Sequence, residues 1–335
     1  VLIYDASPLH LHRQNSGESL RKGFHHLAEK PPSVTRDEHV GERKLASKSS
    51  VNYKVDFVER ENPVVQKIIE IFSEETIEEV KVFRESSFGV QRVLQPVEFS
   101  HIKGGCVLDK MSNDIYVMYL LDTNLEFEEA KIDYVMPKTI GGEKVLMTNG
   151  SGSREIDEET AIGKCVGKFS SGDTAVELRA SWLGLSDESY IWNKRIHEKF
   201  DEDILHSEHR EIEEKGFESE ECRFLVVDGG RKVLADLLNQ KIYDLDAEKE
   251  LDVPSSPRDQ LYRVLEKAVL NAAGVQENSV DEGEVDEFMN ALFDVQESCD
   301  GQLFEEVDSA TDRIRSLMTS DKKISDKQDL EGVAR

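Results

Sequence analysis

A carboxylate that precedes a Glu-x-Lys pair is a pattern of residues able to cleave phosphodiesters. Carboxylate oxygens bind a divalent cation, and a lysine nearby can stabilise the charge that develops during hydrolysis. Asp56, followed by Glu79 and Lys81, has this order. Because 33% of the residues are charged, the same order also arises by chance. The alternative interpretation is an amphipathic helix with an exposed Glu79 and Lys81.

Two further groupings could hold a ligand. Asp228, Gly229 and Gly230 lie between a predicted strand and a predicted helix, where glycines let backbone N–H groups approach a phosphate. The alternative is a tight turn that uses glycine's conformational freedom, because the sequence contains neither G-x-G-x-x-G nor G-x-x-x-x-G-K-[ST]. His206 and His209 lie three positions apart on a predicted helix, whereas helical zinc sites use H-E-x-x-H.

The cysteines give no metal pattern. The chain has four, separated by tens of residues and without a C-x-x-C pair, which favours reduced thiols. We therefore expect no metal and no cofactor.

The elements that must position these residues are both strands and helices. Alternation predicts a strand over 53–57, and Asn62 before Pro63 is typical of a helix start. The apolar segments 106–108 and 115–121, separated by turn formers, predict a β-hairpin. Other predicted strands are 131–136, 144–147, 161–169, 175–182 and 222–227, and other predicted helices are 64–72, 73–83, 190–205, 233–238, 261–270 and 288–293.

This pattern predicts an α+β fold, with a mixed α/β N-terminal domain around a mainly antiparallel sheet and a mainly helical C-terminal domain. The expected parts are a basic, partly irregular arm (1–50), an α/β domain (51–185), a mainly helical acidic domain (186–320) and a flexible tail (321–335). The expected core comprises Ile68, Ile69, Phe72, Val107, Tyr116, Met118, Leu120, Trp182, Trp192 and Leu225.

Charge is unevenly distributed along the 335 residues. The net charge is −27, yet residues 1–50 carry eight Lys/Arg against six Asp/Glu, so the rest of the chain carries −29. Only this first segment is suited to a polyanion. The alternative is a solvated N-terminus with ordinary charges. The DNA-binding candidates are Arg13, Arg21, Lys22, Arg36, Arg43, Lys44 and Lys48.

Residues 268–312 contain thirteen Asp/Glu and no Lys or Arg around an apolar stripe. Such a surface could imitate the charge of DNA or bind a basic protein, and the alternative is a solvated helical surface. The partner-binding candidates are Glu284, Asp286, Glu287, Phe288 and Phe293.

No apolar run approaches the roughly 20 residues that a bilayer requires, and residues 1–20 lack the apolar stretch of a signal peptide. We therefore expect a cytoplasmic protein that does not bind membranes.

The order of elements over residues 53–182 resembles the bacterial nucleoid-associated protein family. The matching segments are the charged strand 53–57, the helix start 62–65, the serine-bearing segment 86–94, the apolar segment 104–121 and the acidic segment 156–162. The resemblance implies a mixed α/β N-terminal domain, a helical C-terminal domain, a homodimer, and association with double-stranded DNA or with DNA-topology enzymes.

On this basis we expect a non-enzymatic, nucleoid-associated, DNA-related binding protein. The first alternative is an acidic protein-interaction module, acting as a DNA mimic or an anti-phage defence component. The second is a metal-dependent nuclease that uses Asp56, Glu79 and Lys81.

Overall fold

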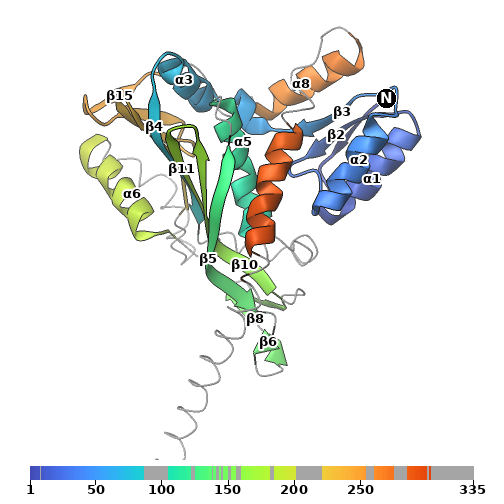
Figure 1. Cartoon of the computed structure of the whole chain (residues 1–335), viewed down its shortest axis with the longest axis horizontal. Helices are drawn as coiled ribbons and strands as arrows, with labels where there is room; N and C mark the ends of the chain where they lie inside the picture. The colour runs from blue at the N-terminus through green and yellow to red at the C-terminus, as the bar shows by residue number, and fades with distance from the viewer. Residues whose placement is uncertain are drawn as a thin grey trace, which may run out of the picture.

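The fold combines a small parallel sheet, a large mixed sheet and helices that pack on both (Figure 1). The α+β class expected from the sequence is confirmed. The computed structural model describes residues 1–7, 9–86, 105–121, 125–137, 139–140, 143–144, 146–149, 152–155, 160–181, 185–200, 221–253, 260–274, 285–299 and 302.

The first 56 residues form a parallel unit rather than a partly irregular arm. Its strands pair in the order β1-β2-β3, and a helix lies in each crossover, as parallel pairing requires. Strand β3 was predicted, over 53–57, but β1 and β2 were not. Strand β2 is short and buried, so it lacks the alternation of a half-exposed strand. The unit contains β1 (Leu2–Asp5), α1 (Leu9–Arg21), β2 (His25–Glu29), α2 (Arg36–Ala46) and β3 (Tyr53–Asp56).

The segment after β3 leads into the large sheet. A 3-10 turn, η1 (Val58–Glu61), precedes α3 (Pro63–Phe72). The Asn62 side chain accepts a hydrogen bond from Val64 N at 3.0 Å, which confirms the predicted helix start. One face of α3 is buried, including Ile68 and Phe72, as its apolar stripe predicts.

Eight strands form the large sheet, in the order β15-β14-β13-β12-β4-β11-β10-β5. Only β4 and β11 pair in parallel; every other neighbouring pair is antiparallel. The strands are β4 (Ile77–Ser86), β5 (Glu126–Pro137), β10 (Thr160–Ser171), β11 (Thr174–Ser181), β12 (Glu221–Gly229), β13 (Lys232–Asp236), β14 (Lys241–Asp244) and β15 (Lys249–Leu251). Two small hairpins are β6 (Thr139–Ile140) with β7 (Glu143–Lys144), and β8 (Leu146–Asn149) with β9 (Gly152–Glu155).

Several predicted elements are wrong. β4 and β13 lie where helices were predicted, because both are buried by sheet neighbours on either side, which overrides local helical spacing. The predicted hairpin 106–121 is instead a π-helical turn, η2 (Val107–Met111), followed by α5 (Ser112–Leu120). Nearly all its apolar side chains are buried, so the segment has no polar face and its sequence resembles a buried strand. The segment 186–320, expected to be mainly helical, includes β12 to β15.

Helices cover both faces of the large sheet. The main core gathers α3, η2, α5 and the helix over residues 285–299 against one face. On the other face, Ile196 of α6 (Asp187–Phe200) packs with Phe83 and Phe224 of the sheet. Of the expected core, Ile68, Phe72, Val107, Tyr116, Met118 and Leu225 are buried, Ile69, Leu120 and Trp192 pack partly buried, and Trp182 lies outside the described residues.

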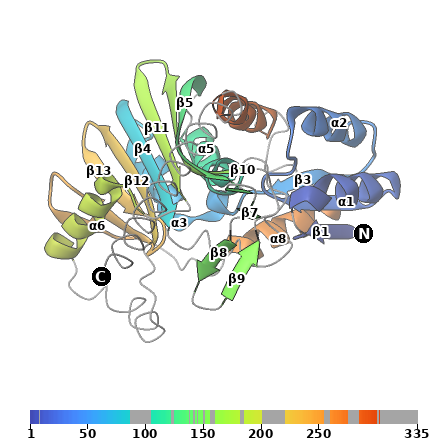
Figure 2. The ribbon, with the colours of Figure 1, turned by 90° about the horizontal axis from the view of Figure 1, so that it is seen from below.

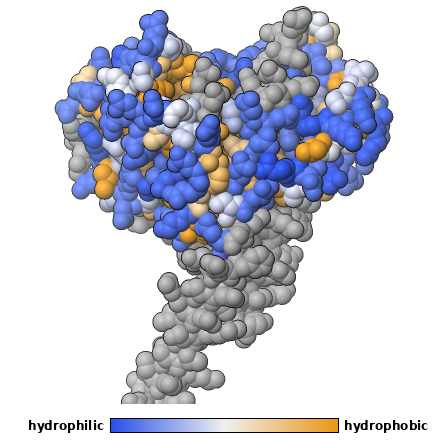
Figure 3. Space-filling model, viewed as in Figure 1, coloured by the Kyte–Doolittle hydropathy of each residue, from blue (hydrophilic) through white to orange (hydrophobic). Residues whose placement is uncertain are grey.

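The parallel unit lies beside the large sheet rather than on it (Figure 2). Helix α8 (Gln260–Ala272) runs along the parallel unit and packs on η1. The face shown in Figure 3 is mostly hydrophilic, with apolar residues in small groups. Within the described part of the chain, every helix is too short or too polar to cross a bilayer.

Candidate functional site

The nuclease residues are not brought together. Asp56 is buried at the end of β3 in the small sheet, while Glu79 and Lys81 lie on β4 of the large sheet. Lys81 pairs with Glu188 of α6 at 3.3 Å and with Glu79 at 3.5 Å. Among the described residues, no group of three or more His, Cys, Asp or Glu side chains is arranged to hold a metal ion. His206 and His209 lie outside the described residues.

The glycine turn is also not a phosphate site at a helix start. Asp228 and Gly229 are the last residues of β12, and Gly230 begins the turn to the antiparallel strand β13. A Cβ added at Gly229 would lie 2.3 Å from the Thr76 backbone oxygen. Glycine at 229 is therefore needed for the close approach of two backbone segments. The conformational freedom expected from the sequence is not used, because neither Gly229 nor Gly230 has a positive φ.

Two of the DNA-binding candidates pair with the acidic helix over residues 285–299. Arg36 donates to Asp294 at 2.8 Å and to Glu297 at 2.9 Å. Arg43 donates to Asp286 at 2.8 Å, so this partner-binding candidate also pairs within the chain. These contacts hold the C-terminal helix on α2.

The remaining candidates lie at separate places. Arg13 pairs with Glu38 on the neighbouring helix, and Lys22 pairs with Glu18 one turn earlier. Arg21, Lys44 and Lys48 are exposed at the ends of α1 and α2. Phe288 and Phe293 are completely or almost completely buried in the main core, Glu287 is exposed, and Glu284 lies outside the described residues.

A polar pocket of about 220 Å³ lies where the parallel unit meets the large sheet. It is formed by the end of β2, the turn η1, the end of β4, the η2–α5 segment and the start of β12. Carboxyl ends of parallel strands are where α/β folds place their ligands, and here β2 ends at the pocket and η1, which follows β3, lines it. The lining residues are Lys30, Val58, Glu59, Arg84, Ser86, Asp109, Lys110, Asn113, Glu221 and Arg223.

A buried arginine organises the floor of the pocket. Arg84 donates through Nε to Asp114 at 2.7 Å and through a terminal nitrogen to Glu59 at 2.8 Å. Asn62 donates to the other Glu59 oxygen at 2.8 Å. Burial alone would raise the pKa of Glu59, but Arg84 and Asn62 lower it below its usual value. Burial raises the pKa of Asp114 to about 6 despite Arg84, so both carboxylates are ionised at neutral pH.

Two lysines line the pocket, and each donates its hydrogen bond to an uncharged oxygen. Lys30, the residue after β2, donates to the Asp109 backbone oxygen at 2.5 Å. Lys110 is 8% exposed and donates to the hydroxyl of Ser86 at 2.6 Å. Burial lowers the pKa of both ammonium groups, although the nearby Asp109 opposes this. A lysine whose pKa is lowered in a pocket can exchange a proton with a bound oxygen.

A pair of acidic residues, one of them buried, lies on the strand ends beside Lys30. Glu29 and Asp56 are in register on β2 and β3, and Tyr4 of β1 donates to Glu29 at 2.5 Å. Asp56 is completely buried, and among the described residues neither of its carboxyl oxygens has a hydrogen-bond partner. Burial, followed by the charge of Glu29, raises the pKa of Asp56 to about 7. The parallel unit therefore tends to hold a proton at this edge.

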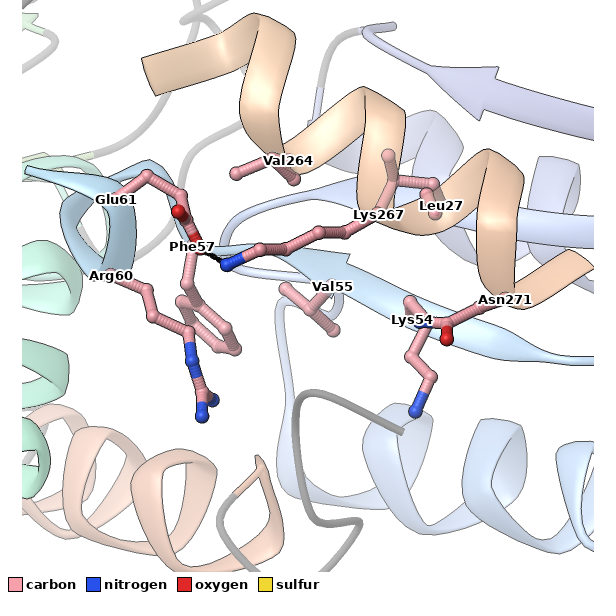
Figure 4. A pocket seen from close by; sticks show the side chains of 10 residues that line it. Leu27, Lys54, Val55, Phe57, Arg60, Glu61, Val264, Lys267 and Asn271 are labelled. Atoms are coloured by element: carbon pink, nitrogen blue, oxygen red, sulfur yellow. Dashed lines mark hydrogen bonds and ion pairs between the residues drawn. The ribbon is translucent and has the colours of Figure 1, made fainter. Parts of the chain in front are cut away.

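A second, smaller pocket lies between β3, η1 and α8 (Figure 4). It encloses only about 30 Å³, and Val55, Phe57 and Val264 contribute apolar side chains to it. Lys267 of α8 reaches across to the Glu61 carboxylate (Figure 4). This pocket is a small gap in the interface where α8 packs against the parallel unit.

Lys30 and Lys110 were not predicted to be site residues. Lys30 was counted among the basic residues of the expected arm, and Lys110 lies in the segment predicted to be a hairpin. The one local signal was the buried run His26-Leu27-Ala28, followed by charged residues and Pro31, which marks the carboxyl end of a buried strand.

The fold is similar to that of several solved oxidoreductases. Levoglucosan dehydrogenase in complex with NADH and levoglucosan has a TM-score of 0.62 at 13% identity, covering 90% of this chain and 78% of that one. A 3-ketoreductase from Actinomadura kijaniata in complex with TDP-benzene and NADP has a TM-score of 0.61 at 12% identity, covering 89% and 77%. Biliverdin reductase from Synechocystis in complex with biliverdin and NADP+ has a TM-score of 0.59 at 14% identity, covering 89% and 78%. No protein-family model matches the chain, and no curated protein is significantly similar in sequence.

These comparisons overturn the expected identity. The similar structures are dehydrogenases and reductases, so the resemblance to nucleoid-associated proteins is wrong, as are the non-enzymatic function and the DNA partner inferred from it. The family resemblance failed because its matching positions were mostly apolar, and apolar order is shared by many α+β folds. The homodimer and the cytoplasmic location stay predictions.

The described residues fit the nicotinamide ring of a nicotinamide cofactor, which is its reacting end, but not its phosphates. The end of β2, the turn η1 and the amine of Lys30 open onto one pocket, as the reacting end requires. A dinucleotide's phosphates are bound by a glycine-rich turn before a helix, and the sequence contains no G-x-G-x-x-G. Residues that would hold the phosphates are therefore not assigned.

Proposed function

We propose that this chain is an NAD(P)-dependent oxidoreductase of the Gfo/Idh/MocA type, which interconverts an alcohol and a carbonyl group in a small polar molecule. The observation that carries the proposal is Lys30, whose pKa is lowered and whose amine enters the polar pocket at the end of β2. The fold supports it, because the similar structures named above are dehydrogenases and reductases with NADH, NADP or NADP+ bound. When bound, such a cofactor supplies or accepts a hydride at the reacting carbon.

Lys30 is the residue suited to hold a proton at the reacting oxygen. Its ammonium would donate to a carbonyl oxygen as that oxygen becomes an alcohol, and its amine would take the proton back in the reverse direction. The bond to the Asp109 backbone oxygen orients the lysine without neutralising it, since a carbonyl carries no net charge.

The remaining pocket groups are suited to a polyhydroxylated substrate. Asn113 supplies an amide, which both donates and accepts hydrogen bonds. Glu221 and Arg223 are paired at 2.9 Å on β12 and supply both kinds of group at another wall. Arg84 and its two carboxylates keep the floor of the pocket rigid, because each partner is buried and bonded.

A hydride-transfer assay tests the proposal. The purified chain is incubated with NADH or NADPH and a panel of keto-sugars, and with NAD+ or NADP+ and a panel of sugars and polyols, while the reduced cofactor is followed by absorbance. Lys30→Met should lower turnover by about 10²- to 10⁴-fold, the usual contribution of a positioned acid–base group. Lys44→Met, an equivalent change at an exposed site on α2, should leave turnover unchanged. Full turnover in Lys30→Met, or no binding of any nicotinamide nucleotide by calorimetry, would contradict the proposal.

A further inference from the structure

Lys110 is the second ammonium group of the pocket, and the proton chemistry assigned to Lys30 does not use it. It is 8% exposed, whereas lysines seldom lie buried without a paired charge. Its only hydrogen bond among the described residues goes to the neutral hydroxyl of Ser86. Burying an ammonium group with only neutral acceptors is costly, which is why burial lowers its pKa.

Most carboxylates around the pocket form ion pairs with arginines. Glu59 accepts from Arg84 and Asn62, and Glu221 accepts from Arg223 at 2.9 and 3.0 Å. Asp114, behind the floor, also accepts from Arg84.

Four charged groups surround Lys110. Asp109 and Glu221 favour its ammonium form, and Arg84 and Arg223 oppose it. Asp109 also acts on Lys30, so two ammonium groups share this carboxylate. Lys30, Lys110 and Asp109 together therefore carry one positive charge in excess, which Arg84 with its two carboxylates offsets only from behind the floor.

Ser86 makes this place suitable for a carboxylate. Its hydroxyl oxygen accepts from Lys110 at 2.6 Å, so its own hydrogen is left to donate elsewhere. Ser86 is 2% exposed and lies at the pocket end of β4. A lysine N–H and a serine O–H side by side supply one donor to each oxygen of a carboxylate.

We propose that the substrate carries a carboxylate group, and that Lys110 and Ser86 bind this group while Lys30 acts at the reacting oxygen. This inference rests on the proposed oxidoreductase function for the identity of the reaction, but the binding of an anion is tested without turnover. Lys110 is then a residue that determines specificity.

Calorimetric titration with matched ligands tests the proposal. The ligands are hexuronates and hexonates, each compared with its neutral amide, and every titration is made with and without NADP+. Because a hydrogen bond to a charged group is the stronger kind, at least one acid should bind about 10- to 100-fold more tightly than its amide. Lys110→Met should reduce this preference to about twofold or less, Lys110→Arg should retain much of it, and Lys44→Met should leave it unchanged. Equal binding of every acid and its amide by the native chain, or a preference that persists in Lys110→Met, would overturn the proposal.

A second measurement uses only the native chain, so its result does not depend on whether a variant folds. An anion beside an ammonium group favours its charged form, so binding of the preferred acid to the native chain should take up protons at alkaline pH. Titrations in two buffers that differ in ionisation enthalpy measure this uptake, and its absence would overturn the proposal. A preference for acids without hydride transfer would support the anion site and contradict the oxidoreductase. Hydride transfer to acids and amides alike, with equal affinity, would support the oxidoreductase and contradict the anion site.

Discussion

Replacing Asp56 with asparagine should change how the stability of the protein depends on pH. Asp56 is completely buried, and burial and the charge of Glu29 raise its pKa from 3.8 to about 7. The folded protein therefore binds this proton more tightly than the unfolded chain does. The contribution of Asp56 to stability is consequently greatest at low pH and is lost as pH rises from about 4 to about 7. Integrating the two titrations gives a loss of about 2–3 kcal/mol between pH 5 and pH 8, as an order of magnitude.

Asparagine has nearly the same shape and does not titrate, so Asp56→Asn should lack this loss. Urea unfolding at pH 5 and pH 8 measures the free energy of unfolding for both proteins. The variant should gain stability relative to the native chain by about 2–3 kcal/mol between the two pH values, whatever constant cost the buried amide adds. Asp252→Asn, at an exposed position after β15, is the matched control and should show no such gain. A difference between Asp56→Asn and the native chain that is constant with pH would refute the reasoning.

Three other changes test the fold. Burial lowers the pKa of His26 to about 4, so the contribution of His26 to stability should fall by about 2 kcal/mol from pH 7 to pH 5, and His26→Gln should lack that fall in the same urea titrations. Phe288→Ala should cost about 3–5 kcal/mol by denaturant unfolding, whereas Glu287→Ala on the same helix should change stability by less than about 0.5 kcal/mol. Gly229→Ala would place a Cβ 2.3 Å from a backbone oxygen and should lower the melting temperature clearly, whereas Gly230→Ala meets only a side chain at 3.1 Å and should lower it less.

Elements whose limits and exposed faces depend on nearby residues were predicted correctly from capping residues and from the spacing of apolar residues. The start of α3 follows from Asn62 and Pro63, and its buried face from an apolar stripe. The half-buried strand β11 alternates along its length and was predicted nearly to its ends. Strand β12 was also predicted, but the buried elements β4, β13 and 106–121 were predicted wrongly. The segment 105–121 has no polar face, so its periodicity could not distinguish a helix from a strand.

The candidate site could not be predicted in the same way, because no local pattern describes it. Its lining residues come from five segments spread between Lys30 and Arg223. Lys30 reaches the pocket only because β2 is a parallel strand that ends there, and the sequence analysis did not predict the parallel unit. The basic residues of the N-terminal segment were wrongly interpreted as a DNA-binding surface for a related reason. Arg36 and Asp294 are separated by 258 positions, so their pairing is a product of the fold.

Charge matching separates the structural cations of this chain from those of the pocket. Arg36 and Arg43, candidates for DNA contact by composition, bond to carboxylates of the helix over residues 285–299. Arg84 is buried and bonded to two carboxylates. Lys30 and Lys110 differ, because Lys30 is partly buried and Lys110 is buried, each against a neutral oxygen, at a cost that folding alone does not require. Uncompensated charge is tolerated where a ligand supplies the compensation, so the two lysines, rather than the basic N-terminal surface, are where function is to be tested.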